Sequence, residues 1–185
     1  MFVASALPSN ISQQEIISRN SFLDEQLKSK GLYTSDVRGD GNCFFRSLSV
    51  CLHGHENEHS LLRKDIANHM KINVDSSSIL NGTVIQHIVD VGTDGVWAGE
   101  DVIVASADYL CRDIQVFLAT DKSSPRTYCP TTCISSLPSL RIAYYEPGHY
   151  VPVFSMNGST FDDIFDSETP PSQTDTRDAA SPLPN

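Results

Sequence analysis

Residues 36–52 read DVRGDGNCFFRSLSVCL, and this stretch decides the fold. Its first seven residues hold two glycines among acidic and amide residues, a composition typical of a tight loop. The residues that follow place Phe44 and Leu48 at helical spacing on an apolar stripe. We therefore predict a glycine-rich loop that leads directly into a helix beginning near Cys43, with a thiol at the helix N-terminus.

The rest of the first half is also predicted to be helical. Ser12 and Glu15 form a capping box, and the apolar residues after them recur at helical spacing, which predicts a helix over about 12–30. Similar stripes predict three further helices, over about 58–70, 83–91 and 99–111.

The second half has a residue composition typical of β-strands. Runs rich in β-branched and aromatic residues predict strands over 114–118, 140–145 and 150–154. The last two flank a short Pro-Gly connection, which predicts an antiparallel hairpin with His149 at its exit. Pro152 indicates either an edge strand or an N–H direction that needs no partner. We predict an α+β fold, with helices packed on a small, mostly antiparallel sheet.

Composition bounds the organisation of the chain. With 185 residues, 39% of them hydrophobic, it can form one ordinary domain plus a modest extension. Six acidic residues and one basic residue lie after position 160, and from about residue 166 scarcely any apolar residue remains to support a core. We expect a folded domain over about 10–160 and a disordered, acidic, Ser/Pro-rich tail over 166–185.

Charge and hydropathy exclude several classes of partner. The formal net charge of −10 is opposite to what a phosphate backbone attracts, so we expect no nucleic acid partner. No stretch approaches the length of apolar sequence that spans a bilayer, and the first residues lack the pattern of a secretory signal. We expect a monomer without a membrane partner, located in the cytoplasm or elsewhere inside the cell.

The cysteines and histidines permit a metal or disulfide interpretation, which we do not favour. The five cysteines have no recurring spacing and are expected to be reduced thiols, with Cys51 and Cys111 in the core. Two clusters have spacings near those of metal ligands, but neither supplies the usual four, so we predict no metal. These clusters are His53, His55 and His59, and Cys129 with Cys133.

Two residues are suited to thiol chemistry. A helix N-terminus favours the thiolate of Cys43, and the amides of Gly41 and Asn42 beside it suit a developing oxyanion. His149, at the start of a strand after a turn, suits a general base, and we expect it to depress the pKa of the thiol together with the helix N-terminus. Each residue alone also has an ordinary explanation, because free cysteines are usually core residues and loop-edge histidines are usually solvated.

In combination, three motifs resemble those of the ovarian tumour (OTU) family of deubiquitinating cysteine proteases. The segment DGNCFFR at 40–46, led in by Arg38 and Gly39, resembles the family's nucleophile motif. The triplet GHY at 148–150 resembles its histidine motif. Between them, GTDGVWAGE at 92–100 resembles the segment that lines the substrate channel before a helix and a strand. The motifs occur in the family's order and cover about 36–155.

The resemblance implies a papain-like fold and a chemistry that uses no metal or cofactor. It implies hydrolysis of the bond after the C-terminal glycine of ubiquitin or a ubiquitin-like protein, with these proteins and their conjugates as partners. Cys43 would be the nucleophile, and His149 the base and then the acid. Asp40, with the amides of the loop, would shape the oxyanion site. Asp40 equally suits a turn residue that holds the loop.

Substrate contacts are expected from two segments. Gly41 and Asn42 belong to the loop, and Gly99 lies beside Trp97 where a second backbone would come close. Trp97 either packs as an ordinary half-buried residue or walls the slot for the Gly-Gly end of the substrate. Glu100 is suited to the basic tail of ubiquitin, although a solvated acid at a helix N-terminus is the simpler interpretation.

One position departs from the family pattern. Many members place Asn or Asp two residues after the histidine, on the same strand face, and this chain has Val151 there. The group that orients the imidazole is then expected from Asp40, which we favour, or from Asp36, Asn157 or a backbone carbonyl. The departure leaves one alternative to a deubiquitinase, a ubiquitin-binding pseudoenzyme of the same fold that has lost turnover. A separate alternative is a cysteine protease that cuts a peptide or polyprotein.

Overall fold

The computed structural model describes residues 11–74, 82–121 and 124–156. The tail predicted to be disordered, over 166–185, lies outside the described residues, as does Asn157.

The described ranges contain five helices, all at positions that the apolar spacing predicts. They are α1 (Gln13–Ser29), α2 (Cys43–His53), α3 (His59–Asn73), α5 (Gly82–Gly92) and α6 (Glu100–Leu110). Ser12 caps α1 as predicted, because the Glu15 N–H donates to Ser12 Oγ over 3.2 Å, while the Glu15 carboxylate accepts from Arg19. α2 begins at Cys43 itself and ends at His53, and the next residue, Gly54, adopts the left-handed conformation that glycine allows.

The strands form one mixed sheet in the order β1-β5-β4-β2-β3. They are β1 (Leu32–Thr34), β2 (Ile114–Leu118), β3 (Arg126–Tyr128), β4 (Leu140–Tyr145) and β5 (His149–Ser155). β2 and β4 pair in parallel, and the other neighbours are antiparallel, so the predicted α+β class and the β4–β5 hairpin are confirmed. The strands β1 and β3 were not predicted, because three residues are too few to show an alternating pattern.

Pro152 is not on an edge strand, so that interpretation was wrong. β5 lies between β1 and β4, and Val151 beside the proline is only 5% exposed. The Pro152 carbonyl accepts from the Ser35 N–H over 3.2 Å, one residue past the end of β1. The N and O of a strand residue point to the same side, so the missing N–H faces a place where β1 has already ended.

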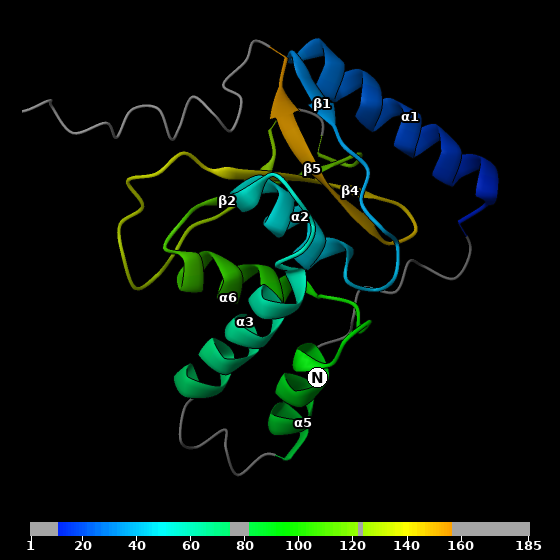
Figure 1. The fold of residues 1–185 in the computed structure, drawn as a ribbon. Helices are drawn as coiled ribbons and strands as arrows, with labels where there is room; N and C mark the ends of the chain where they lie inside the picture. Colours follow the sequence, from blue (N-terminus) through cyan, green and yellow to red (C-terminus); the bar gives the residue numbers. More distant parts are fainter. Residues whose placement is uncertain (1–10, 75–81, 122–123, 157–185) are drawn as a thin grey trace, which may run out of the picture.

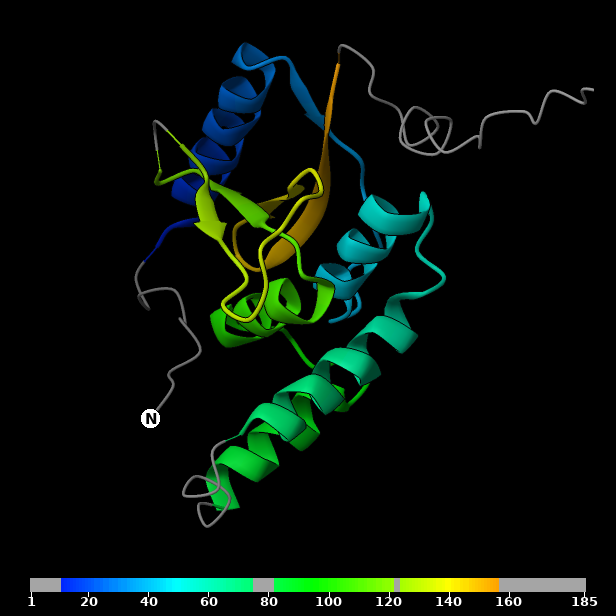
Figure 2. The same ribbon diagram turned by 90° about the vertical axis from the view of Figure 1, so that its left-hand side faces the viewer.

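Helices cover both faces of the sheet. α1 and α2 lie on opposite sides of it (Figure 2), while α3 and α5 run side by side away from the sheet (Figure 1). Leu23 and Leu27 form the buried face of α1, and Phe44 and Leu48 are buried under α2. The core therefore lies on both sides of the strand that carries His149.

α1 also holds the turn between β4 and β5. The Asn20 side chain donates to the Glu146 carbonyl over 2.8 Å and accepts from the Glu146 N–H over 3.0 Å. Arg19 forms a 3.0 Å ion pair with the Glu146 carboxylate. Asp24 accepts a hydrogen bond from the Tyr145 hydroxyl. These contacts fix the turn three residues before His149.

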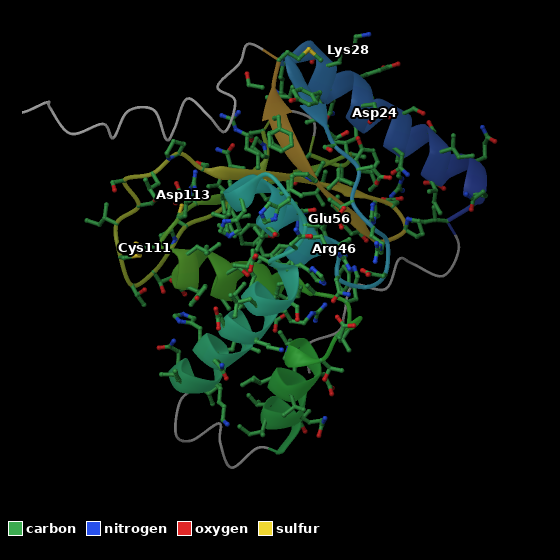
Figure 3. The ribbon with its side chains drawn as sticks, viewed as in Figure 1. Asp24, Lys28, Arg46, Glu56, Cys111 and Asp113 are labelled. Atoms are coloured by element: carbon green, nitrogen blue, oxygen red, sulfur yellow. A yellow bond between two sulfur atoms is a disulfide. The ribbon has the colours of Figure 1, made fainter. Side chains whose placement is uncertain are left out.

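Two cysteines are joined, so the expectation of five reduced thiols was wrong for them. Cys111 and Cys133 form a disulfide with a Cα–Cα distance of 5.9 Å. Cys111, labelled in Figure 3, follows the last turn of α6, and the segment after β3 folds back over that helix end. Thr131 Oγ1 donates to Asp108 there, over 2.9 Å. This proximity arises from the tertiary structure and has no signal in the spacing.

The structure also bears on membrane insertion. In the ranges it describes, no helix combines the length and apolar character needed to cross a bilayer.

We predict that Asn20→Ala lowers the free energy of unfolding by about 2 kcal/mol, because it removes two hydrogen bonds and leaves the Glu146 backbone groups without them. Asn73→Ala is the matched control, since Asn73 bonds only within the last turn of α3 and should cost less than about 0.5 kcal/mol. Urea denaturation measures both values. Equal effects would show that α1 does not hold the turn.

Candidate active site

The Cys43 thiol lies where α2 begins and faces β5. Its side chain is buried, with the residue 3% exposed. The Tyr150 N–H donates to Sγ over 3.5 Å, and the backbone N–H groups of Cys43 and Phe44 also face the sulfur. The thiol thus lies among backbone donors from two elements, and the strand donor is the residue next to His149.

Burial raises the pKa of the Cys43 thiol above its ordinary value. We expected a depressed pKa from the helix N-terminus, and the direction is the opposite because removal of the sulfur from water penalises the thiolate. The N–H groups of Tyr150, Phe44 and Cys43 lower the pKa but do not outweigh burial. Burial is therefore the dominant influence on the pKa of this thiol.

His149 begins β5, and its ring lies beside the loop that precedes α2. Its Nε2 is 3.3 Å from Asp36 Oδ1. A Cβ built on Gly39 would lie 3.6 Å from Cε1 and 3.7 Å from Nδ1 of the ring, so the loop backbone passes close to the imidazole. Asp36 is thus the carboxylate beside the histidine, although its own side chain is 91% exposed.

Asp40, which we favoured as the orienting group, lies against α2. Its carboxylate accepts from the Asn42 N–H over 3.1 Å and from Arg46 over 2.6 and 3.1 Å. Arg46 is also bonded to Glu56 over 3.1 Å (Figure 3). The Arg46 guanidinium holds the pKa of the Asp40 carboxyl well below its usual range. Asp40 therefore acts here as the turn residue that braces the loop.

The loop packs backbone against backbone on the segment before α6. Gly41 has φ +82°, and a Cβ there would lie 1.9 Å from the Gly95 carbonyl oxygen, so only glycine fits. Asn42, 2% exposed, accepts from the Gly95 N–H through Oδ1 over 3.1 Å. Its own N–H donates to Asp40, so this amide is not free for an oxyanion.

Trp97 lies next to the histidine strand. Its ring stacks on Tyr150 with centroids 5.9 Å apart, and a Cβ on Gly148 would lie 3.7 Å from its Nε1. This Nε1 is buried and has no hydrogen-bond partner among the described residues. A Cβ on Gly99 would lie 4.0 Å from the indole. Trp97 therefore packs against Tyr150, with its buried Nε1 beside Gly148.

Glu100 lies at the start of α6, as predicted. Its carboxylate accepts from the Tyr128 hydroxyl over 2.7 Å, which ties α6 to β3. Burial, together with this bond, raises the pKa of Tyr128 to about 12. Tyr128 was not singled out from the sequence, since β3 itself was not predicted.

Other residues at the site gave no local signal. Arg46 and Glu56 brace Asp40, and Arg63 bonds to the nucleophile loop from α3. Arg63 stands directly after Leu62 on an apolar stripe, where the periodicity gives no indication of a polar role.

The histidine and cysteine clusters do not assemble into a metal centre. His59 Nδ1 lies 3.3 Å from Arg46 and 2.8 Å from the Glu56 carbonyl oxygen, and Cys133 is in the disulfide. Within the described ranges, no group of three or more His, Cys, Asp or Glu residues could hold a metal ion.

Comparisons with known proteins match this geometry to one family. Residues 38–150 match the family model described as OTU-like cysteine protease. The chain is 27% identical over 139 residues to the OTU domain-containing protein 1 of Mus musculus, covering 71% of this chain and 30% of that protein. It is 30% identical over 113 residues to the OVARIAN TUMOR DOMAIN-containing deubiquitinating enzyme 9 of Arabidopsis thaliana, covering 59% and 31%.

A solved structure shows the same fold. The OTUD1 OTU domain superposes with a TM-score of 0.62 at 25% identity, covering 78% of this chain and 100% of that domain. The chain thus spans about a third of the length of the two curated relatives but the whole of the solved domain.

We predict that alkylation of Cys43 by iodoacetamide keeps accelerating with pH above the range in which an ordinary thiol ionises, because a raised pKa keeps the thiol protonated to higher pH. The exposed Cys129 should label faster than Cys43 at neutral pH. Peptide mass spectrometry measures both rates, with Cys43→Ala identifying the Cys43 signal. A Cys43 rate that is already constant from about pH 6 upward would instead demonstrate a preformed thiolate.

Proposed function

The chain belongs to the OTU-like cysteine protease family, and on that premise we propose that it is a deubiquitinase. It hydrolyses the bond after the C-terminal glycine of ubiquitin or a ubiquitin-like protein. The observation that carries the proposal is the 3.5 Å bond from the Tyr150 N–H to Cys43 Sγ, which joins the thiol to the strand that begins with His149. The printed name of the Arabidopsis relative, a deubiquitinating enzyme, supports the substrate class.

A thiol whose pKa is raised by burial requires a general base. His149 takes the Sγ proton as sulfur attacks the carbonyl carbon of the terminal glycine, and it then gives that proton to the leaving amine. Water, deprotonated by the same imidazole, afterwards hydrolyses the thioester and regenerates the thiol. With its Nε2–H donated to Asp36, the ring keeps Nδ1 as the acceptor for the thiol proton.

The loop residues position the carbonyl oxygen during this attack. Asp40, held by Arg46, fixes the turn, and its bond to the Asn42 N–H leaves the N–H groups of Gly41 and Cys43 as our assigned oxyanion donors. The helix dipole of α2 adds positive potential at the same place. This arrangement stabilises negative charge that develops only during the reaction.

The substrate tail is assigned to the space beside Trp97. Gly148 has no side chain next to the indole, which suits a slot for two glycines. Gly41, Asn42 and Gly99 form the backbone around this slot, and Glu100 faces the basic part of the tail.

A ubiquitin-binding pseudoenzyme is the second candidate. The raised pKa of Cys43 and the exposure of Asp36 favour it, since a solvated carboxylate 3.3 Å from the ring orients the imidazole weakly. Binding without turnover distinguishes this candidate from a deubiquitinase.

Covalent capture tests the proposal. Ubiquitin with a C-terminal electrophile should attach to Cys43, and Cys43→Ala should abolish the adduct. Cys43→Ala and His149→Ala should each remove nearly all turnover of a ubiquitin C-terminal amide reporter, because nucleophile and base act as one unit. Cys129→Ser is the matched control and should keep the wild-type rate. Ubiquitin binding with neither capture nor turnover would establish the pseudoenzyme.

We predict that Asp36→Ala lowers kcat on the same reporter by about 10-fold with little change in KM, because the carboxylate orients the base and does not contact substrate. Asp65→Ala is the control, since that exposed carboxylate bonds only the distant Tyr109 hydroxyl. A wild-type kcat in Asp36→Ala would return the orienting role to another group.

A further inference from the structure

Arg63 is a buried cation on α3 that has no acidic partner in its hydrogen bonds. The residue is 2% exposed, and its guanidinium carbon lies 4.2 Å from the centroid of the Phe45 ring. Burial lowers its pKa. All four of its hydrogen bonds go to uncharged oxygens.

Those four oxygens belong to two separate segments. Arg63 Nε donates to Asn42 Oδ1 over 3.1 Å, and Nη2 donates to the Gly41 carbonyl over 3.0 Å. Nη1 and Nη2 also donate to the carbonyls of Val91 and Val96, each over 2.7 Å. One planar guanidinium therefore joins the nucleophile loop to both ends of the segment that leads to Trp97.

The contact at Gly41 fixes a peptide plane. Its carbonyl points to Arg63, and the N–H on the other end of the same peptide, that of Asn42, donates to Asp40 over 3.1 Å. A peptide unit held at both ends cannot rotate. The N–H groups on either side of it, those of Gly41 and Cys43, are thereby directed by the same clamp.

Burying a charged side chain at this position costs free energy, which indicates that its directed hydrogen bonds serve a purpose beyond packing. An apolar residue would also fill a buried position on α3, and the buried Arg63 guanidinium loses hydration that Asp94 and Asp40 offset only in part and without a direct bond. A planar fork is the side chain that reaches four carbonyl-type oxygens in different directions. Beyond packing, the hydrogen bonds of this fork orient the loop that precedes α2.

We propose that Arg63 is a positioning residue that clamps residues 40–43 against residues 91–96 and so holds the oxyanion donors in place for the tetrahedral intermediate. The catalytic role of Arg63 rests on the proposed thiol hydrolysis, whereas the four hydrogen bonds that form the clamp do not depend on it.

Arg63→Lys and Arg63→Gln test the clamp on the ubiquitin amide reporter. Lysine keeps the charge but not the fork, so both variants should lose kcat by about 30-fold, with KM within about 3-fold of wild type. Arg112→Gln is the matched control, because Arg112 is also desolvated and donates to a carbonyl, that of Pro138, outside the site. Its kcat should stay within about 2-fold of wild type. Wild-type kcat in Arg63→Lys would overturn the inference.

Alkylation separates positioning from general damage. Iodoacetamide reacts with the Cys43 thiolate without forming an oxyanion, so its rate and pH profile in Arg63→Lys should match the wild type. A fall in alkylation parallel to kcat would show that Arg63 acts on the thiol or on the fold, and would overturn the clamp.

A third measurement does not depend on turnover. Acetyl-glycyl-glycinal forms a thiohemiacetal: sulfur bonds to the aldehyde carbon, the carbonyl π pair moves to oxygen, and that oxygen receives the thiol proton. Its affinity should fall about 10-fold in Arg63→Lys, even if the wild type turns over no reporter. In the unmodified chain, the Asn42 and Gly95 amides should exchange hydrogen as slowly as those inside α2. Unchanged aldehyde affinity or fast exchange would overturn the inference.

Discussion

The packing of α2 on β5 is the contact on which the candidate site depends. Phe44 and Tyr150 meet edge to face with centroids 5.4 Å apart, and each ring stands one residue after the thiol or the imidazole. Because both rings are buried in the core, hydrophobic packing sets the positions of the neighbouring Cys43 and His149. The site is therefore as rigid as the core beneath it, and its chemistry does not depend on a flexible loop for the placement of sulfur.

The same burial works against the reactivity of the thiol. Removal of Cys43 from water raises its pKa, and the surrounding N–H groups offset only part of that penalty. In the proposed reaction such a thiol depends on its general base, so the geometry around His149 would have more influence than it would beside a preformed thiolate. Asp36 and the turn held by Asn20 are the two features that set that geometry, one through the ring and one through the backbone.

Much of the loop geometry comes from polar side chains on helices remote in sequence. Arg46 fixes Asp40 from α2, and Arg63 fixes the Gly41 carbonyl from α3. Arg63 thus satisfies a loop carbonyl directly, whereas Arg46 holds the carboxylate that accepts from the Asn42 N–H. Gly41 permits this closeness, because any side chain there would push the two segments apart, and Gly95 has a φ of +78° that favours glycine.

The sequence by itself determined the helices, the three longer strands, the α+β class and the placement of Cys43 at a helix start, because these depend on periodicity, capping and turn chemistry among near neighbours. Only the tertiary structure decided that Asp36 lies at His149, that Arg63 lies on the loop, that Cys111 meets Cys133, and that β5 is internal. The tertiary structure also decided the direction of the Cys43 pKa shift, because the prediction from the helix N-terminus and His149 did not include burial of the sulfur. Each involves groups separated by tens of residues, and the packing of the core, which no local spacing encodes, brings them into contact.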